Sequence, residues 1–245
     1  MGYYDYQQGL IRHHMDQEGG WDSHLEHCRN FILKAIEIIK PDTVTVLGSG
    51  WLLDLPLAEM TETVEKINLV DIIHPPEVIS QVSGLDKVKL IEQDITGGLI
   101  KETWMAAHRH TFLNPLESLD EISVTEYQPV DDPGLIISVN ILTQLESLPV
   151  KLLKGKMKAD DAGFLNFRKE IQKKHIDFLK KHKSVLITDQ SEIVTDNAGN
   201  MTEDISLLTE LPDGTYKEEW TWYFEMQRSD YYNKRSVFNV VGLIF

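Results

Sequence analysis

The stretch that most constrains the fold is an apolar run that ends in two closely spaced glycines. Residues 44–47 read Val-Thr-Val-Leu, and Gly48, Ser49 and Gly50 follow directly. β-branched residues favour a strand, and glycines let a turn bring backbone N–H groups close to a ligand. Asp71 ends the next predicted strand about 20 residues later, the spacing of the acid that meets a ribose in nucleotide-binding βαβ units. The pattern predicts a nucleoside site, with an ordinary strand-to-helix turn as the alternative.

Predicted strands and helices alternate along most of the chain. Strands are expected at 43–47, 66–72, 88–93, 135–139, 184–189, 219–224 and 236–245, and helices at 22–40, 55–63, 77–84, 100–111 and 162–182. This alternation predicts an α/β fold with a doubly wound, mainly parallel seven-stranded sheet and an N-terminal helix. Only about eleven residues separate the last two strands, which is short for a parallel crossover, so we expect an antiparallel C-terminal strand pair.

Several segments lack a clear pattern. Residues 1–20 are predicted to form a polar arm, 115–133 a long acidic excursion, and 190–216 no fixed structure. Asp54 precedes an apolar run with Pro56 in its first turn, so Asp54 is expected to cap the helix that follows.

Composition restricts the possible partners and the compartment. The formal net charge is −15, which argues against a nucleic-acid partner. No apolar run approaches the roughly 18 residues that a membrane span needs, so no membrane partner is expected. The single cysteine, Cys28, excludes an intramolecular disulfide. Because such cysteine usage suits a reducing compartment, we expect a cytoplasmic protein.

Polar residues gather where the predicted strands end. The glycine turn follows the first strand, and Asp71, Asp94 and Ser138 to Asn140 follow three others. In a doubly wound sheet the ligand binds outside the carboxyl ends of the strands. We therefore expect these residues to meet around one pocket.

The glycine turn, the acids ending the second and third strands and the expected antiparallel final strand resemble class I S-adenosylmethionine-dependent methyltransferases. The resemblance covers residues 41–189 well and extends to the last strand pair. It implies a Rossmann-like cofactor-binding domain at 41–245, preceded by an arm and helix at 1–40. It also implies S-adenosylmethionine as cofactor and transfer of its methyl group to an unidentified small molecule. The implied cofactor-binding residues are Gly48, Ser49, Gly50, Asp54, Asp71, Ile72, Asp94, Ile95, Ser138 and Asn140.

The resemblance gives these residues separate tasks. It places the glycine turn beside the methionine part of the cofactor, with Asp54 as a candidate for its amino group. It assigns Asp71 to the ribose hydroxyls, which suits a carboxylate because it accepts two hydrogen bonds from a cis-diol. It assigns Asp94 to the adenine amine, with Ile95 lining that pocket. The loop that begins at Asn140 faces the methyl group.

Candidate catalytic residues are fewer. Methyl transfer from a sulfonium needs alignment of donor and acceptor, sometimes with a base. Asn140 is a candidate for orienting the acceptor, and His110 for the base, because Trp104, His108 and His110 lie in the irregular segment after the third strand. Surface or packing roles for these histidines are the alternative. The sequence also leaves open a lid formed by Trp21 and the N-terminal tyrosines.

Other interpretations remain open. His24 and His27 lie one helical turn apart, but no carboxylate or cysteine completes a recognisable ligand pattern, and no metal is expected. Val46 stands where an acid is usual in the glycine turn, and Leu52 where a third glycine is usual. These departures keep open a nucleoside-binding protein of the same fold without catalysis. A nicotinamide-dependent oxidoreductase is a third possibility, although no tyrosine is followed four residues later by lysine.

Overall fold

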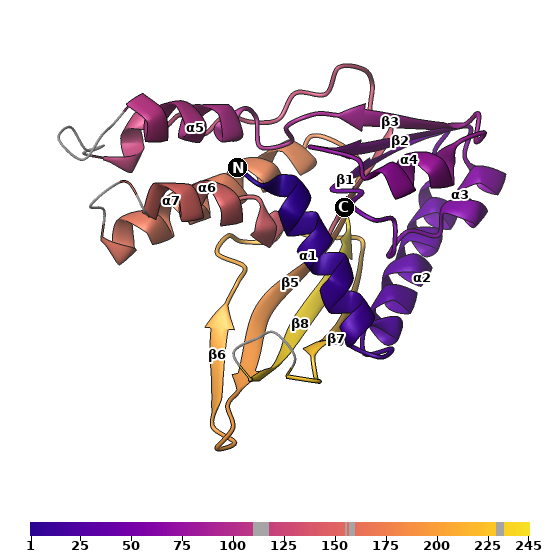
Figure 1. Cartoon of the computed structure of the whole chain (residues 1–245). Coiled ribbons are helices and arrows are strands. Elements are labelled where there is room, and N and C mark those ends of the chain that lie inside the picture. Colours follow the sequence, from indigo (N-terminus) through magenta and orange to yellow (C-terminus); the bar gives the residue numbers. More distant parts are fainter. Residues whose placement is uncertain (110–117, 155, 157–159, 229–232) are drawn as a thin grey trace.

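The computed structural model describes residues 1–109, 118–154, 156, 160–228 and 233–245 (Figure 1). Its helices are α1 (Tyr3–Asp16), α2 (Asp22–Ile39), α3 (Leu57–Thr63), α4 (Pro76–Val82), α5 (Leu99–Arg109), α6 (Ser147–Lys154) and α7 (Asp161–Leu179). Its strands are β1 (Thr43–Leu47), β2 (Lys66–Asp71), β3 (Val88–Glu92), β4 (Leu135–Val139), β5 (Ser184–Thr195), β6 (Met201–Ile205), β7 (Tyr216–Glu225) and β8 (Arg235–Ile244). Among these helices, as far as their residues are described, none is both long and apolar enough to cross a membrane.

The strands form one mixed sheet in the order β3-β2-β1-β4-β5-β8-β7, and β6 pairs with β5 outside this path. Strands β1 to β5 pair in parallel, while β8 runs antiparallel to both β5 and β7. The predicted doubly wound, mainly parallel sheet with an antiparallel C-terminal pair is confirmed. The sheet has one strand more than predicted, because β6 adds an eighth.

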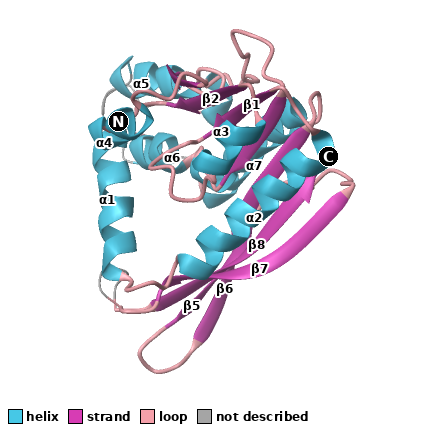
Figure 2. Ribbon diagram, turned by 90° about the vertical axis from the view of Figure 1, so that its right-hand side faces the viewer, coloured by secondary structure: helices cyan, strands magenta, loops and turns pink. Residues whose placement is uncertain are grey.

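Each face of the sheet carries its own apolar core. One core joins the sheet to α2, α3 and α4, with Phe31 and Met60 fully buried. The other joins it to α5, α6 and α7, with Leu99 and Phe178 fully buried. Figure 2 shows α2 running along β7 and β8. Because both faces are covered, the edge formed by the strand ends is where a ligand can approach the sheet.

The N-terminal segment differs from its prediction. Residues 1–20 were expected to form an arm, yet Tyr3–Asp16 is helix α1, so the chain begins with two helices rather than one. This helix is polar on average, and its tertiary contacts explain the difference. Gln7 Nε2 donates to Asp71 Oδ1 at 3.1 Å, and His13 Nε2 lies 3.2 Å from the Phe224 carbonyl oxygen.

Two further predictions were wrong in detail. Residues 190–216 were given no fixed structure, but β5 continues to Thr195 and forms an antiparallel pair with β6. Every residue of β6 is exposed, so no alternation of apolar and polar residues marks it in the sequence. Asp54 does not cap a helix, because Pro56 stands at the N-cap of α3 and the Asp54 carboxylate is bonded to Asn140 instead.

Candidate functional site

A cavity of about 850 Å³ lies at the carboxyl ends of β1, β2 and β4, and α1 contributes to its lining. Nine of the ten residues predicted to bind cofactor line it. They are Gly48, Ser49, Gly50, Asp54, Asp71, Ile72, Asp94, Ile95 and Asn140. Ser138 does not line it, because its side chain is fully buried and its Oγ lies 2.8 Å from His175 Nε2 of α7. Ser138 therefore links β4 to α7 and does not face the cavity.

The glycine turn has the backbone that its sequence predicts. Gly48 and Gly50 both have positive φ, at +77° and +48°, in the left-handed region that glycine adopts most readily. Leu52, which stands where a third glycine is usual, also has a positive φ of 61°. The departure from the glycine pattern therefore changes the side chain while the backbone keeps a left-handed conformation, which is rare for a leucine.

Asp71 is the polar centre of the cavity end next to this turn. Its Oδ2 accepts from the Gly50 N–H at 2.8 Å, and its Oδ1 accepts from the Ile72 N–H at 2.7 Å and from Gln7 Nε2. Burial raises the pKa of Asp71, and the backbone N–H donors oppose that shift. Gln7 Oε1 is buried and finds no hydrogen-bond partner among the described residues. A bound diol would thus meet a carboxylate and an unpaired amide oxygen side by side.

Asp94 lies on the next strand end along the chain. Its Oδ1 accepts from both the N–H and the hydroxyl of Thr96, which holds the loop after β3 in a tight turn. Burial raises the pKa of the Tyr3 phenol of α1, and the nearby charges of Asp94 and Asp71 raise it further. Tyr3 therefore remains protonated and is a hydrogen-bond donor near two carboxylates.

A polar cluster joins the glycine turn to the loop after β4. Asn140 has a left-handed φ of 51°, and its Nδ2 donates to Asp54 Oδ2 at 3.0 Å. His24 Nε2 lies 3.0 Å from the same amide nitrogen, and the Trp220 indole N–H donates to His24 Nδ1. Burial raises the pKa of Asp54 to about 6 and lowers that of His24 to about 3. His24 is therefore neutral at physiological pH and a weak base.

The raised pKa of Asp54 predicts a pH effect on stability. Its pKa is about 6 in the folded protein against a usual value of 3.8, so the folded chain binds more protons between these values. The Asp54 contribution to stability therefore falls as pH rises from about 4 to 6. We expect the Tm of wild type minus that of Asp54→Asn to decrease across this range in thermal melts. The same change at exposed Asp86 is the control, and a pH-independent difference for Asp54→Asn would contradict the prediction.

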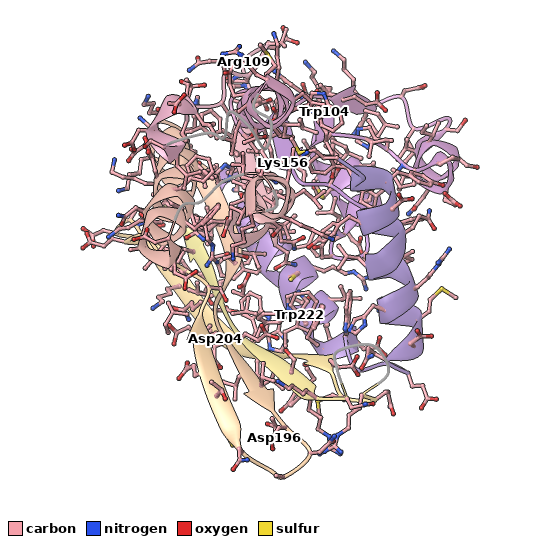
Figure 3. The ribbon with its side chains drawn as sticks, turned by 60° about the vertical axis from the view of Figure 1, so that its left-hand side comes forward. Trp104, Arg109, Lys156, Asp196, Asp204 and Trp222 are labelled. Carbon is pink, nitrogen blue, oxygen red and sulfur yellow. The ribbon has the colours of Figure 1, made fainter. Side chains whose placement is uncertain are left out.

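The remaining histidine and tryptophan candidates come from the irregular segment after the third strand. His110 falls outside the described residues. Trp104 is 46% exposed on α5 (Figure 3). Its ring centroid lies 4.0 Å from that of His108. The surface interpretation of these two side chains fits their positions. As for metals, no group of three potential ligands occurs in the part of the chain that the structure describes.

Sequence reasoning missed two groups of lining residues. The first is Gln7 of α1. Beside it, Tyr3, Tyr6 and Trp21, which the sequence left open as a lid, line the cavity. The second is a set of side chains from the antiparallel end of the sheet: Asp189, Glu192, Asp204, Trp222, Phe224 and Phe238. The alternation of Trp220, Trp222 and Phe224 in the sequence indicated that one face of β7 carries a row of aromatic side chains. The sequence did not show which residues of β5, β6 and β8 lie beside them.

Comparisons with known proteins give distant likenesses only. No known protein family matches the sequence, and no curated protein matches it either. The N1-methyltransferase of 1,6-didemethyltoxoflavin from Burkholderia thailandensis, solved with S-adenosylhomocysteine, is 8% identical over 97% of this chain and 87% of its own, with a TM-score of 0.42. The N-methyltransferase NodS from Bradyrhizobium japonicum, also with S-adenosylhomocysteine, is 10% identical over 89% and 86%, with a TM-score of 0.39. From identities and TM-scores this low, no activity follows for the chain.

Proposed function

We propose that this protein is an S-adenosylmethionine-dependent methyltransferase that acts on a small molecule. The observation that carries the proposal is the Asp71 carboxylate, which ends β2, accepts the Gly50 N–H and lines the cavity. The strand order supports it, because a doubly wound sheet binds ligands at the carboxyl ends of its strands. The cavity volume of about 850 Å³ falls in the range of small-molecule sites.

The residues present fit the nucleoside part of the cofactor. In this proposal Asp71 and Gln7 Oε1 accept the two ribose hydroxyls, which would supply the partner that Gln7 Oε1 lacks among the described residues. Asp94 accepts the adenine amine, and Ile95 lines the adenine pocket. The glycine turn passes the methionine part, whose amino group suits the Asp54 carboxylate. The assignments of Asp71, Gln7, Asp94 and Asp54 each pair a donor of the cofactor with an acceptor of the chain.

Methyl transfer requires little from the protein beyond the correct positioning of methyl donor and acceptor. When bound, the cofactor supplies an electrophilic methyl group. The chain's own residues then hold donor and acceptor in line and exclude water. Asn140 fits the orienting role, because its amide both donates and accepts hydrogen bonds and cannot act as a general base near neutral pH. Its bond to Asp54 fixes the amide at the carboxyl end of β4.

A cofactor-binding protein without catalysis would use the same residues. The left-handed backbone at Leu52 favours a turn that still binds, so the missing third glycine does not by itself argue for lost activity. Turnover with a methyl acceptor distinguishes the two functions. A comparison of NAD with S-adenosylhomocysteine as ligands tests the nicotinamide-dependent oxidoreductase alternative.

We expect S-adenosylhomocysteine to raise the Tm and NAD to leave it unchanged. A ligand that binds the folded state alone stabilises it by about 2.7 kcal/mol at a hundred times its Kd. For a chain of this size that corresponds to a shift of about 5–10 °C. Thermal melts at millimolar ligand measure it. A shift with NAD and none with S-adenosylhomocysteine would favour the oxidoreductase instead.

A further inference from the structure

One row of side chains crosses four strands at the antiparallel end of the sheet. Asp204 of β6 lies opposite Glu192 of β5, Glu192 opposite Phe238 of β8, and Phe238 opposite Trp222 of β7. Directly opposed residues project from the same face of a sheet. All four line the cavity, with Asp204 and Trp222 at the two ends of the row (Figure 3). We call this row of four residues the wall of the cavity. Along it, two acidic side chains are followed by two aromatic rings.

A strand irregularity adds a third acid to this wall. Asp189 and Glu192 are three positions apart, and in a regular strand they would face opposite sides of the sheet. The pairing of β5 with β8 shifts register between Asp189 and Ser191, and both acids line the cavity. Bulges of this kind re-aim side chains and are common next to functional sites.

Two more rings extend the aromatic half. Trp21, at the start of α2, lies with its ring centroid 4.9 Å from that of Trp222 and 5.3 Å from that of Phe224. Phe238 lies 5.6 Å from Trp222 and 5.1 Å from Phe224. The four rings belong to one cluster, and all four residues line the cavity. Such a surface attracts apolar bodies and, through the ring quadrupole, cations.

The charge of the cavity is strongly negative. Its lining includes six carboxylates, from Asp54, Asp71, Asp94, Asp189, Glu192 and Asp204. Arg168 is the single arginine or lysine among the described lining residues, and its Nε donates to Glu146 Oε1 at 3.0 Å. In the methyltransferase proposed above, Asp71 and Asp94 serve the nucleoside, and Asp54 serves the amino group. The other three acids, Asp189, Glu192 and Asp204, lie beside the aromatic rings.

We propose that this wall binds the methyl acceptor, and that the acceptor is a small basic amine carried on an apolar or aromatic body. The inference rests on the proposed function and names its substrate class. The carboxylates of the wall attract the positive charge of the ammonium group, and the aromatic rings pack against the apolar or aromatic part of the acceptor. A divalent cation explains the acids but not the four rings, and a neutral aromatic compound explains the rings but not the acids.

The chemistry of an amine acceptor is balanced without another reagent. The ammonium group first gives a proton to water or a wall carboxylate. Its nitrogen lone pair then forms the bond to the methyl carbon, while the electron pair of the breaking sulfur–carbon bond goes to sulfur. The product is a methylammonium ion, so the positive charge that the acids bind is present both before and after transfer.

The test compares three probes of one shape. Calorimetry measures 2-phenylethylamine, 2-phenylethanol and phenylacetate against the protein, with and without S-adenosylhomocysteine. We expect the amine to bind at least 10-fold more tightly than the alcohol, and phenylacetate to bind most weakly. Glu192→Gln with Asp204→Asn should weaken the amine about 10-fold and leave the alcohol unchanged. Glu203→Gln is the matched control, because Glu203 is next to Asp204 on the opposite face and bonds Ser191.

Each outcome separates the two proposals. Equal affinities for amine and alcohol, with S-adenosylhomocysteine bound normally, would overturn the substrate class and leave the methyltransferase standing. If the double variant instead lowered affinity for S-adenosylmethionine relative to S-adenosylhomocysteine, the acids would serve the sulfonium charge, and the inference would again fail. An amine preference without any S-adenosylhomocysteine binding would support the wall as an amine site and refute the proposed reaction.

Discussion

Asp71→Ala is expected to weaken S-adenosylhomocysteine binding by roughly 10- to 150-fold. The carboxylate lines the cavity and, in the proposed complex, accepts hydrogen bonds from the ribose. Loss of bonds to an ionised group costs about 1.5–3 kcal/mol. The variant also removes the acceptor of the Gly50 N–H, so the glycine turn keeps only the backbone bonds of Gly48 and Ser49 to the Val70 carbonyl of β2. Isothermal titration calorimetry measures the loss directly.

Asp71→Asn is the matched comparison. It keeps one acceptor oxygen of the same shape, so its affinity should fall less than that of Asp71→Ala. Thermal melts of both variants without ligand separate a binding defect from a folding defect. Wild-type affinity in both variants would make Asp71 a structural acid that holds Gly50 and Gln7, and the nucleoside site would have to lie elsewhere.

Local patterns explain why part of this site could be predicted from the sequence. The glycine turn, Asp71 and Asp94 each follow a short run whose strand character is set by neighbouring residues. The parallel sheet then brings the carboxyl ends of these runs to one edge, whatever the rest of the chain does. Ser138 satisfies the same rule, yet its side chain faces His175 of α7 and does not line the cavity. Strand position locates an edge residue, but not the side from which it projects.

Long-range contacts explain what could not be predicted. α1 depends on Gln7 meeting Asp71, 64 residues away, and on His13 meeting Phe224, 211 residues away. The sequence of α1 is too polar to predict that this helix packs over the cavity. The acidic and aromatic wall depends on the register of four strands and on the irregularity at Asp189. A shift of one residue in the register of any of these strands would move its member of the row to the other face of the sheet.

Gly48→Ala is expected to cost about 2–5 kcal/mol of folding stability, more than the same substitution at Gly50. Gly48 has a φ of +77°, which costs an L-residue about 1–2 kcal/mol. A Cβ there would also lie 2.7 Å from Ile141 Cβ and 2.9 Å from its Cγ1, and overpacking of this kind costs about 1–3 kcal/mol. Chemical denaturation of the purified variant measures the sum.

Gly50→Ala isolates the first of these two costs. Gly50 also has a positive φ, +48°, but the nearest atom to a Cβ there is the Gly48 carbonyl oxygen at 3.9 Å. We therefore expect a loss of only about 1–2 kcal/mol. The difference between the two variants is the cost of pressing on Ile141, the residue next to Asn140. Since a displaced Ile141 would carry the Asn140 amide away from Asp54, Gly48→Ala should also lower methyl transfer more than Gly50→Ala. Equal stability of the two variants would show that the loop after β4 yields freely and that the glycine turn does not position it.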